Sequence, residues 1–220
     1  MTAPRLEPPW LTLDLAGEMP VLSWALNRPG LVPARRILWR EVRNADLPED
    51  LDAALWLDAQ LAARGARDAV CFLTSCDISQ FTLAEARADG VHARAVATVG
   101  LSNAEAVGHR LPPAAQGWGT INIAVEIGAG LTEAARLEAL GIATQARTAA
   151  VMAAGMTLPT GLATGTGTDC IAIAAPKGDI RYAGMHTGTG EAVGRAVHDA
   201  VARGVALWQA SDITREARHG

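Results

Sequence analysis

Alternating and continuous apolar runs divide the chain into strands and helices. The clearest strand is residues 120–128, where every second position is aliphatic and where Asn122 and Glu126 face the opposite side. Residues 11–26 hold two apolar runs around a turn at 17–20, which predicts a hairpin. Further apolar, β-rich runs predict strands at 35–42, 68–75, 93–100, 170–175 and 180–185, and 68–75 has the composition of a central strand.

Helical spacing of apolar residues predicts helices over 47–66 and 132–154, and a last helix that begins near Thr189. Residues suited to their ends are Pro48, Glu49, Asp50 and Gly65 for the first, and Thr132 and Gly155 for the second. The second helix carries small residues at Ala135, Ala139, Ala143, Ala146, Ala150 and Ala153, which allow close packing. The last helix has an apolar stripe of Val193, Val197, Ala200, Val201, Gly204 and Trp208.

The remaining segments complete a mixed architecture. Residues 78–90 predict a short helix and a loop, and the Gly- and Pro-rich residues 105–119 predict a loop. The order is therefore strands, helix, strands, helix, hairpin and helix. This order predicts a single domain over residues 1–220, of α/β or α+β class, with helices packed on a mixed β-sheet. A chain of 220 residues is long enough to bury one core.

Composition narrows the setting of the protein. Half of the residues are hydrophobic, and the formal net charge of -4 gives no basic surface for nucleic acid. The N-terminal residues lack an apolar targeting core, and no apolar run is long enough to span a bilayer. The three cysteines are odd in number and have no metal-ligand spacing. We expect a cytoplasmic protein with no membrane or nucleic-acid partner, no metal and no cofactor.

Two TGTG segments lie close together, at 164–167 and 187–190. The first leads into a strand and is not followed by the Lys of a phosphate loop. The second precedes a helix, so its backbone N–H groups are suited to an anion. Alternatively, both segments are only tight turns and helix caps, for which Gly and Thr are common.

A hairpin would bring the two segments together. If the turn centres on Lys177–Gly178, then Asp169 faces His186 and the two TGTG segments form opposite sides of one mouth. An Asp beside a His orients the imidazole and raises its basicity. A turn with a Gly bulge would shift the register by one residue and separate the pair.

Polar residues also follow two predicted strands. Residues 74–77 follow one strand, and Ser102 and Asn103 follow another. Each alone is typical of a turn, but ligands of α/β sheets bind beyond the carboxyl ends of strands. Together they predict a polar mouth. Trp118, in the adjoining loop, is suited either to stack on a ligand or to pack in the core.

Five segments, in order, resemble the adenosylcobinamide amidohydrolase family: FLTSCDISQF, ATVGLSNA, GTINIAV, ATGTGTDCIAIAAP and YAGMHTGTGEAVGRAVHDAV. They cover roughly residues 70–200, and the last two are the most specific. The LTSCD stretch differs from the Thr–Ser–Arg–Asn form of some members, so no role is carried over to Cys76 or Asp77.

The resemblance implies hydrolysis of the amide that joins aminopropanol to the corrin ring of adenosylcobinamide. The products would be adenosylcobyric acid and 1-amino-2-propanol, in corrinoid salvage within cobalamin biosynthesis. The implied partner is adenosylcobinamide or a related corrinoid, as substrate. Assembly into a homo-oligomer is left open.

Amide hydrolysis needs an activated nucleophile, a proton donor for the amine and stabilisation of the oxyanion. We predict attack by water, with Asp169 and His186 as the basic pair and Glu191 as the acid. A covalent route through Ser75, Ser102 or Thr168 is an alternative, while Cys71 and Cys170 read as inert core thiols. The predicted substrate-binding residues are Ser75, Asn103, Asn122, Thr166, Gly167, Thr168, Thr187, Gly188 and Thr189. The alternative from a different class is a non-catalytic corrinoid- or nucleotide-binding module.

Overall fold

The computed structural model describes residues 2–43, 46–48, 50–112 and 119–219. The main strands are β2 (Trp10–Ser23), β3 (Gly30–Glu41), β4 (Val70–Thr74), β5 (Thr82–Ala88), β6 (Val91–Val99), β8 (Ile121–Ile127) and β12 (Cys170–Ala174). The short strands are β1 (Arg5–Glu7), β7 (Ala104–Glu105), β9 (Thr157–Leu158), β10 (Gly161–Leu162) and β11 (Gly165–Thr166). The helices are α1 (Ala53–Ala63), α2 (Glu133–Ala153) and α3 (Gly188–His219), with a 3-10 turn, η2, at Ile78–Gln80.

One mixed sheet organises the molecule, in the order β4-β3-β2-β12-β8-β6-β5, with β1 paired to β2. The pairs β3–β4 and β8–β12 are parallel, and the other main pairs are antiparallel. This confirms the predicted α/β class with a mixed sheet.

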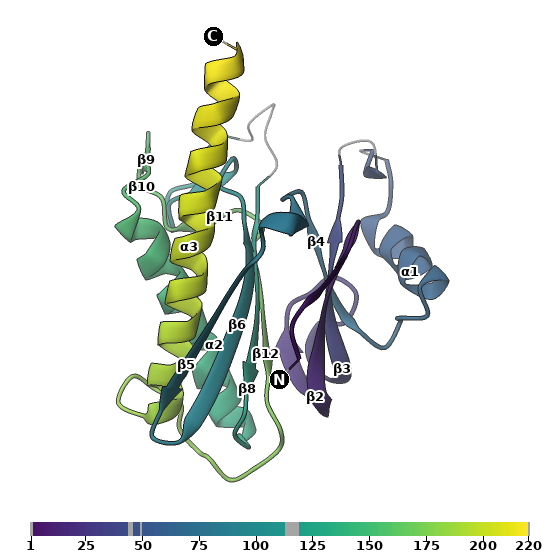
Figure 1. The fold of residues 1–220 in the computed structure, drawn as a ribbon, viewed down its shortest axis with the longest axis vertical. Helices are drawn as coiled ribbons and strands as arrows, with labels where there is room; N and C mark the ends of the chain where they lie inside the picture. Colours follow the sequence, from purple (N-terminus) through teal and green to yellow (C-terminus); the bar gives the residue numbers. More distant parts are fainter. Residues whose placement is uncertain (1, 44–45, 49, 113–118, 220) are drawn as a thin grey trace.

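The sheet folds back on itself, so that its two halves pack face to face. Helices α2 and α3 cover the half made of β5, β6, β8 and β12, while β2, β3 and β4 form the other half and α1 covers the outside of that half (Figure 1). The middle core contains residues of both halves, among them Leu11, Trp39 and Phe72 from one and Val96 and Ala124 from the other. Four layers result, with an apolar core in each of the three interfaces.

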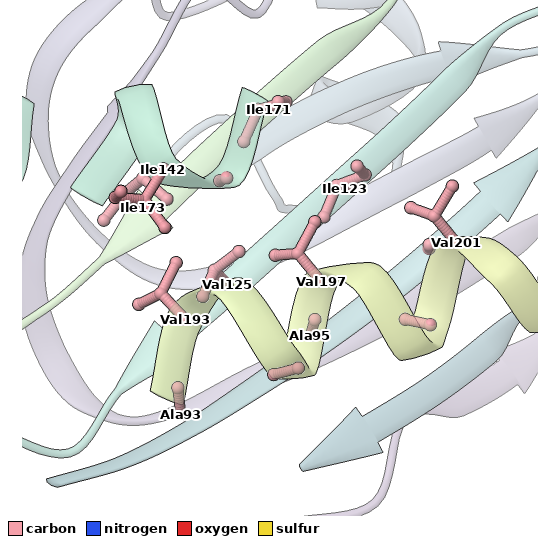
Figure 2. Packing of buried hydrophobic residues seen from close by; sticks show 14 of the residues in the cluster. Ala93, Ala95, Ile123, Val125, Ile142, Ile171, Ile173, Val193, Val197 and Val201 are labelled. Carbon is pink, nitrogen blue, oxygen red and sulfur yellow. The ribbon is translucent and has the colours of Figure 1, made fainter. Parts of the chain in front are cut away.

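The helical side of the sheet carries the predicted apolar stripes. Val193, Val197 and Val201 of α3 face Ile123 and Val125 of β8 (Figure 2). The alternation predicted for β8 is confirmed, because its aliphatic side chains belong to this core while Glu126 lies on the opposite face. Of the predicted alanine stripe on α2, four alanines are buried: Ala135, Ala139, Ala143 and Ala150.

Helix ends follow local signals closely. The Thr132 hydroxyl caps α2 by accepting from Ala135 N at 3.3 Å, and Gly155 takes a positive φ of 72° just after the helix, as predicted. Gly65 has φ 63° after α1. The start of α1 is displaced, because the carboxylate of Asp52 caps it and Pro48 lies before it. Glu49 lies outside the described residues.

The predicted hairpin over 11–26 is wrong, because these residues lie mostly within one long strand, β2, whose hairpin partner is β3. The residues predicted to turn instead form a bulge between Asp14 and Met19. Buried Glu126 holds that bulge by accepting from Ala16 N at 2.8 Å, and Arg94 neutralises its charge. The contact that prevents a turn thus comes from a distant strand.

Three further expectations are corrected. Strand β4 is an edge strand; it is apolar because α1 and the middle core cover its faces. Residues 78–90 begin with the short 3-10 helix η2, but strand β5 follows where a loop was predicted. Residues 180–185 form no strand: β12 is already paired on both sides, with β2 and β8, and only Lys177 and Ile180 make single bridges to Leu131.

Candidate active site

A cavity of about 480 Å³ lies where the two halves of the sheet meet. The end of β4, the start of β8, the residues before β12 and the loop after β2 line it. Much of its wall is apolar. Its polar side chains are Thr74, Ser75, Thr120, Asn122, Thr168 and Asp169. An apolar cavity with a few convergent polar groups is the usual form of a small-molecule site.

Asn122 ties the two halves together at this cavity. Its buried amide donates to the Leu73 carbonyl at 2.8 Å, across from β8 to the end of β4. Its side-chain oxygen accepts from the Thr120 hydroxyl at 3.3 Å. Predicted from sequence as a substrate-binding residue, Asn122 lines the cavity and also fixes its shape.

Asp169 accepts four hydrogen bonds, which hold its carboxylate in one orientation. Oδ1 accepts from Ile121 N at 2.9 Å and from the Thr166 hydroxyl at 2.5 Å. Oδ2 accepts from Thr166 N at 3.0 Å and from the guanidinium of Arg147. These bonds connect the loop before β12 to the start of β8 and to α2, and they use about all of the acceptor sites of a carboxylate.

Arg147 is a residue that the sequence analysis missed. It forms a largely buried ion pair with Asp169, with side-chain exposures of 14% and 7%. The signal was present, since Arg147 lies one turn from Ala143 and Ala150 on the stripe of α2 that faces the core. A charged side chain on a buried stripe indicates a buried partner.

The first TGTG segment is shaped around this ion pair. A Cβ on Gly165 would lie 1.7 Å from a guanidinium nitrogen of Arg147, so a side chain there would displace the ion pair. Gly167 N donates to the Asn103 carbonyl at 3.3 Å, and the Thr168 hydroxyl donates to the Gly119 carbonyl at 3.1 Å. The segment thus presents Gly167 and Thr168 to the cavity.

The second TGTG segment lies at the other end of the sheet. Gly188 packs against Asp89 in the turn between β5 and β6, whereas the other end of β6 adjoins Thr120 and the cavity. The nine residues of β6 separate these ends by about 30 Å. The predicted contact between Asp169 and His186 is therefore wrong, because the hairpin that it required does not form.

Local contacts explain the second segment as a helix start. The Thr187 hydroxyl caps α3 by accepting from Gly190 N at 2.9 Å. A Cβ on Gly190 would lie 2.1 Å from the Gly184 carbonyl oxygen. His186 is exposed, and exposed Glu191 pairs with Arg195 one turn along the helix. These contacts match the interpretation as turn and cap.

The predicted site residues divide into three groups. Those that line the cavity are Ser75, Asn122, Gly167, Thr168 and Asp169. Thr166 and Asn103 lie directly behind it. Thr166 is hydrogen-bonded to Asp169, and Asn103 to Gly167. Those at the opposite end are His186, Thr187, Gly188, Thr189 and Glu191. Ser102 lines a smaller cavity of about 60 Å³ that Ser75 also borders, and Trp118 lies outside the described residues.

The thiols near the cavity are protonated at neutral pH. Burial raises the pKa of Cys170 to about 12 and raises the pKa of Cys71 and Cys76 as well. Since the thiolate is the nucleophilic form, Cys71 and Cys170 act as apolar wall, in line with their expected inertness.

No cluster of three or more His, Cys, Asp or Glu side chains with metal-binding geometry occurs among the residues that the structure describes. Among the same residues, no helix has both the length and the apolar character needed to cross a bilayer.

Comparisons with known proteins identify the family of this chain. No curated protein matches the chain significantly. The crystal structure of the PH0078 protein from Pyrococcus horikoshii OT3 aligns with 93% of this chain and 81% of its own, at 10% identity and a TM-score of 0.42. A family model described as adenosylcobinamide amidohydrolase matches residues 2–212, nearly the whole chain. The chain therefore belongs to the adenosylcobinamide amidohydrolase family.

Proposed function

We propose that the protein hydrolyses the amide between the corrin ring and aminopropanol in adenosylcobinamide, giving adenosylcobyric acid and 1-amino-2-propanol for corrinoid salvage. The family match over residues 2–212 carries this proposal. The cavity supports it, because its apolar wall and its hydroxyl and amide groups suit an uncharged amide.

Asp169 is the best candidate for the base. Among the described residues that line the cavity, it provides the carboxylate, and none of them is a histidine. Arg147 and the backbone amides of Ile121 and Thr166 hold the carboxylate without help from the Thr166 hydroxyl. Rotation of the Thr166 hydroxyl would therefore free one lone pair of Oδ1 for a water molecule.

The reaction then proceeds by direct attack of water. Asp169 takes one proton as the water oxygen bonds to the amide carbon, and the carbonyl oxygen becomes an oxyanion. The hydroxyls of Ser75, Thr120 and Thr168 line the same cavity. Those of Thr120 and Thr168 now donate to protein oxygens, and they would donate to the oxyanion after rotating toward it. The proton on Asp169 passes to the nitrogen as the C–N bond breaks, which releases the amine and leaves the carboxylic acid on the corrin.

The direct test is release of 1-amino-2-propanol from adenosylcobinamide, measured by mass spectrometry. The wild-type protein should release one equivalent, and Asp169→Asn should lower kcat by roughly 100-fold or more, the scale of acid–base catalysis. Tight corrinoid binding without turnover would instead identify a non-catalytic binding module. Trapping of an acyl-enzyme at Ser75 or Thr168 would replace water attack by the covalent route.

Independence from metals and cofactors stays a prediction. Dialysis against EDTA should leave the rate of amine release unchanged. Loss of activity that one divalent ion restores would contradict it.

A further inference from the structure

The cavity is too small for the whole of the proposed substrate. Its volume of about 480 Å³ lies within the roughly 300–1,000 Å³ that holds a drug-sized ligand. A corrin ring with its amide side chains and adenosyl ligand is far larger. If the proposed function holds, only the aminopropanol arm enters, and the macrocycle stays at the mouth.

The loop after β2 provides an apolar rim at that mouth. Trp24 and Leu26 both line the cavity, yet they are 47% and 49% exposed. Exposed apolar side chains that are grouped, as these two are at the mouth of one cavity, are a sign of a ligand surface. Exposed Tyr182 and Met185, by contrast, lie in the segment between β12 and α3 and do not line this cavity.

This rim is held rigidly on both sides. The Trp24 indole N–H donates to the Asp169 carbonyl oxygen at 2.8 Å, which fixes the ring next to the proposed base. The Asn27 side chain spans the free edge of β4, donating to the Ala69 carbonyl at 2.8 Å and accepting from Cys71 N at 3.0 Å. A ring that is already ordered loses little conformational entropy when a ligand stacks on it.

We propose that Trp24 and Leu26 form the surface on which the corrin macrocycle rests while its aminopropanol arm reaches the cavity. Trp24 determines specificity for the macrocycle, because the flat indole offers a large apolar contact with its polar N–H already satisfied. The same ring is hydrogen-bonded to the backbone of Asp169. A macrocycle that rests on it therefore fixes how far the aminopropanol arm reaches toward the Asp169 carboxylate.

Steady-state kinetics with adenosylcobinamide test this inference. Trp24→Ala should raise KM by about 10-fold with a much smaller change in kcat, and Trp24→Phe should restore most of the affinity. Tyr182→Ala is the matched control, since it removes an exposed aromatic ring away from the cavity, and it should match the wild type. An unchanged KM for Trp24→Ala, or a fall confined to kcat, would overturn the inference.

A binding measurement separates this inference from the proposed function. Adenosylcobyric acid keeps the macrocycle and lacks the arm, so its Kd reports on the rim alone. Its Kd should rise about 10-fold in Trp24→Ala, and an equal Kd in both proteins would refute the role of the rim. If the wild type releases no amine from adenosylcobinamide, the proposed reaction fails, whatever the Kd values show.

Discussion

At the residue scale, burial decides what an ion pair contributes. Asp169 and Arg147 are largely buried, whereas Glu191 and Arg195 are more than half exposed. Removing one partner of a buried pair leaves an uncompensated charge, but an exposed pair is screened by water. The two arginines therefore offer a matched comparison.

We predict that Arg147→Ala lowers the free energy of unfolding by about 3–5 kcal/mol, because Asp169 loses its counter-ion inside the protein. Arg195→Ala should change it by less than about 1 kcal/mol. Urea denaturation of both variants measures the difference. If both variants lost the same free energy of unfolding, the Asp169 carboxylate would be solvated more than its burial indicates.

The buried thiols give a dependence of stability on alkaline pH. The pKa of Cys170 is raised to about 12 in the folded protein, so its contribution is complete below the unfolded pKa near 9 and is lost as pH rises from there. The loss is about 1.4 kcal/mol for each pH unit in that window. Cys170→Ala should therefore show a shallower fall of unfolding free energy between pH 9 and 11 than the wild type. Parallel curves would contradict this.

At the element scale, two helical glycines have opposite surroundings. A Cβ on Gly141 of α2 meets nothing within 4 Å, whereas a Cβ on Gly204 of α3 would lie 2.5 Å from a methyl group of Val99 on β6. Helix α3 approaches the sheet closely at this point because the residue has no side chain.

Replacement of each glycine by alanine should therefore have opposite signs. Gly141→Ala should stabilise by about 0.5–1 kcal/mol through the loss of unfolded-chain entropy. Gly204→Ala should destabilise by about 1–3 kcal/mol through overpacking against Val99. Thermal unfolding followed by circular dichroism checks both. A stabilising Gly204→Ala would show that α3 shifts without cost.

Elements set by local signals were predictable, and their distant pairings were not. Thr132 and Gly155 mark the ends of α2 because caps act within a few residues. The bulge in β2 depends on Glu126, more than 100 residues away, so the chain around Gly17 reads as a hairpin turn. Likewise, β12 is occupied by β2 and β8, which excludes the hairpin with 180–185.

At the scale of the whole molecule, the candidate site also combines residues predictable from local signals with residues brought together by distant pairings. Asn122 and Thr168 line the cavity because residues next to strand ends tend to gather at one edge of a sheet, and their role in substrate binding stays a prediction. The cavity itself forms where the two halves of the sheet meet, and the pattern of apolar and polar residues along the chain does not show this contact. Trp24 and Thr120 were missed for this reason, since each becomes part of a site only when the halves meet.

Because the two TGTG segments lie at opposite ends of the sheet, we predict that substitutions beside them affect activity differently. His186→Ala should keep kcat and KM for adenosylcobinamide within about twofold, because some 30 Å of sheet lies between it and Asp169. The Asp169→Asn protein serves as the inactive reference in the same assay. A folded His186→Ala protein with a 100-fold lower kcat would place the chemistry at the start of α3 instead.

The pairing of β2 with β12 also constrains how the chain matures during synthesis. Val21 leaves the ribosome some 150 residues before its partner Ala174, so the end of β2 at Val21–Ser23 presents an unsatisfied edge through most of translation. Such distant pairing slows folding and exposes intermediates to aggregation. Nascent chains that end before residue 170 should therefore depend on chaperones, and the cavity should be assembled only after its last wall has emerged.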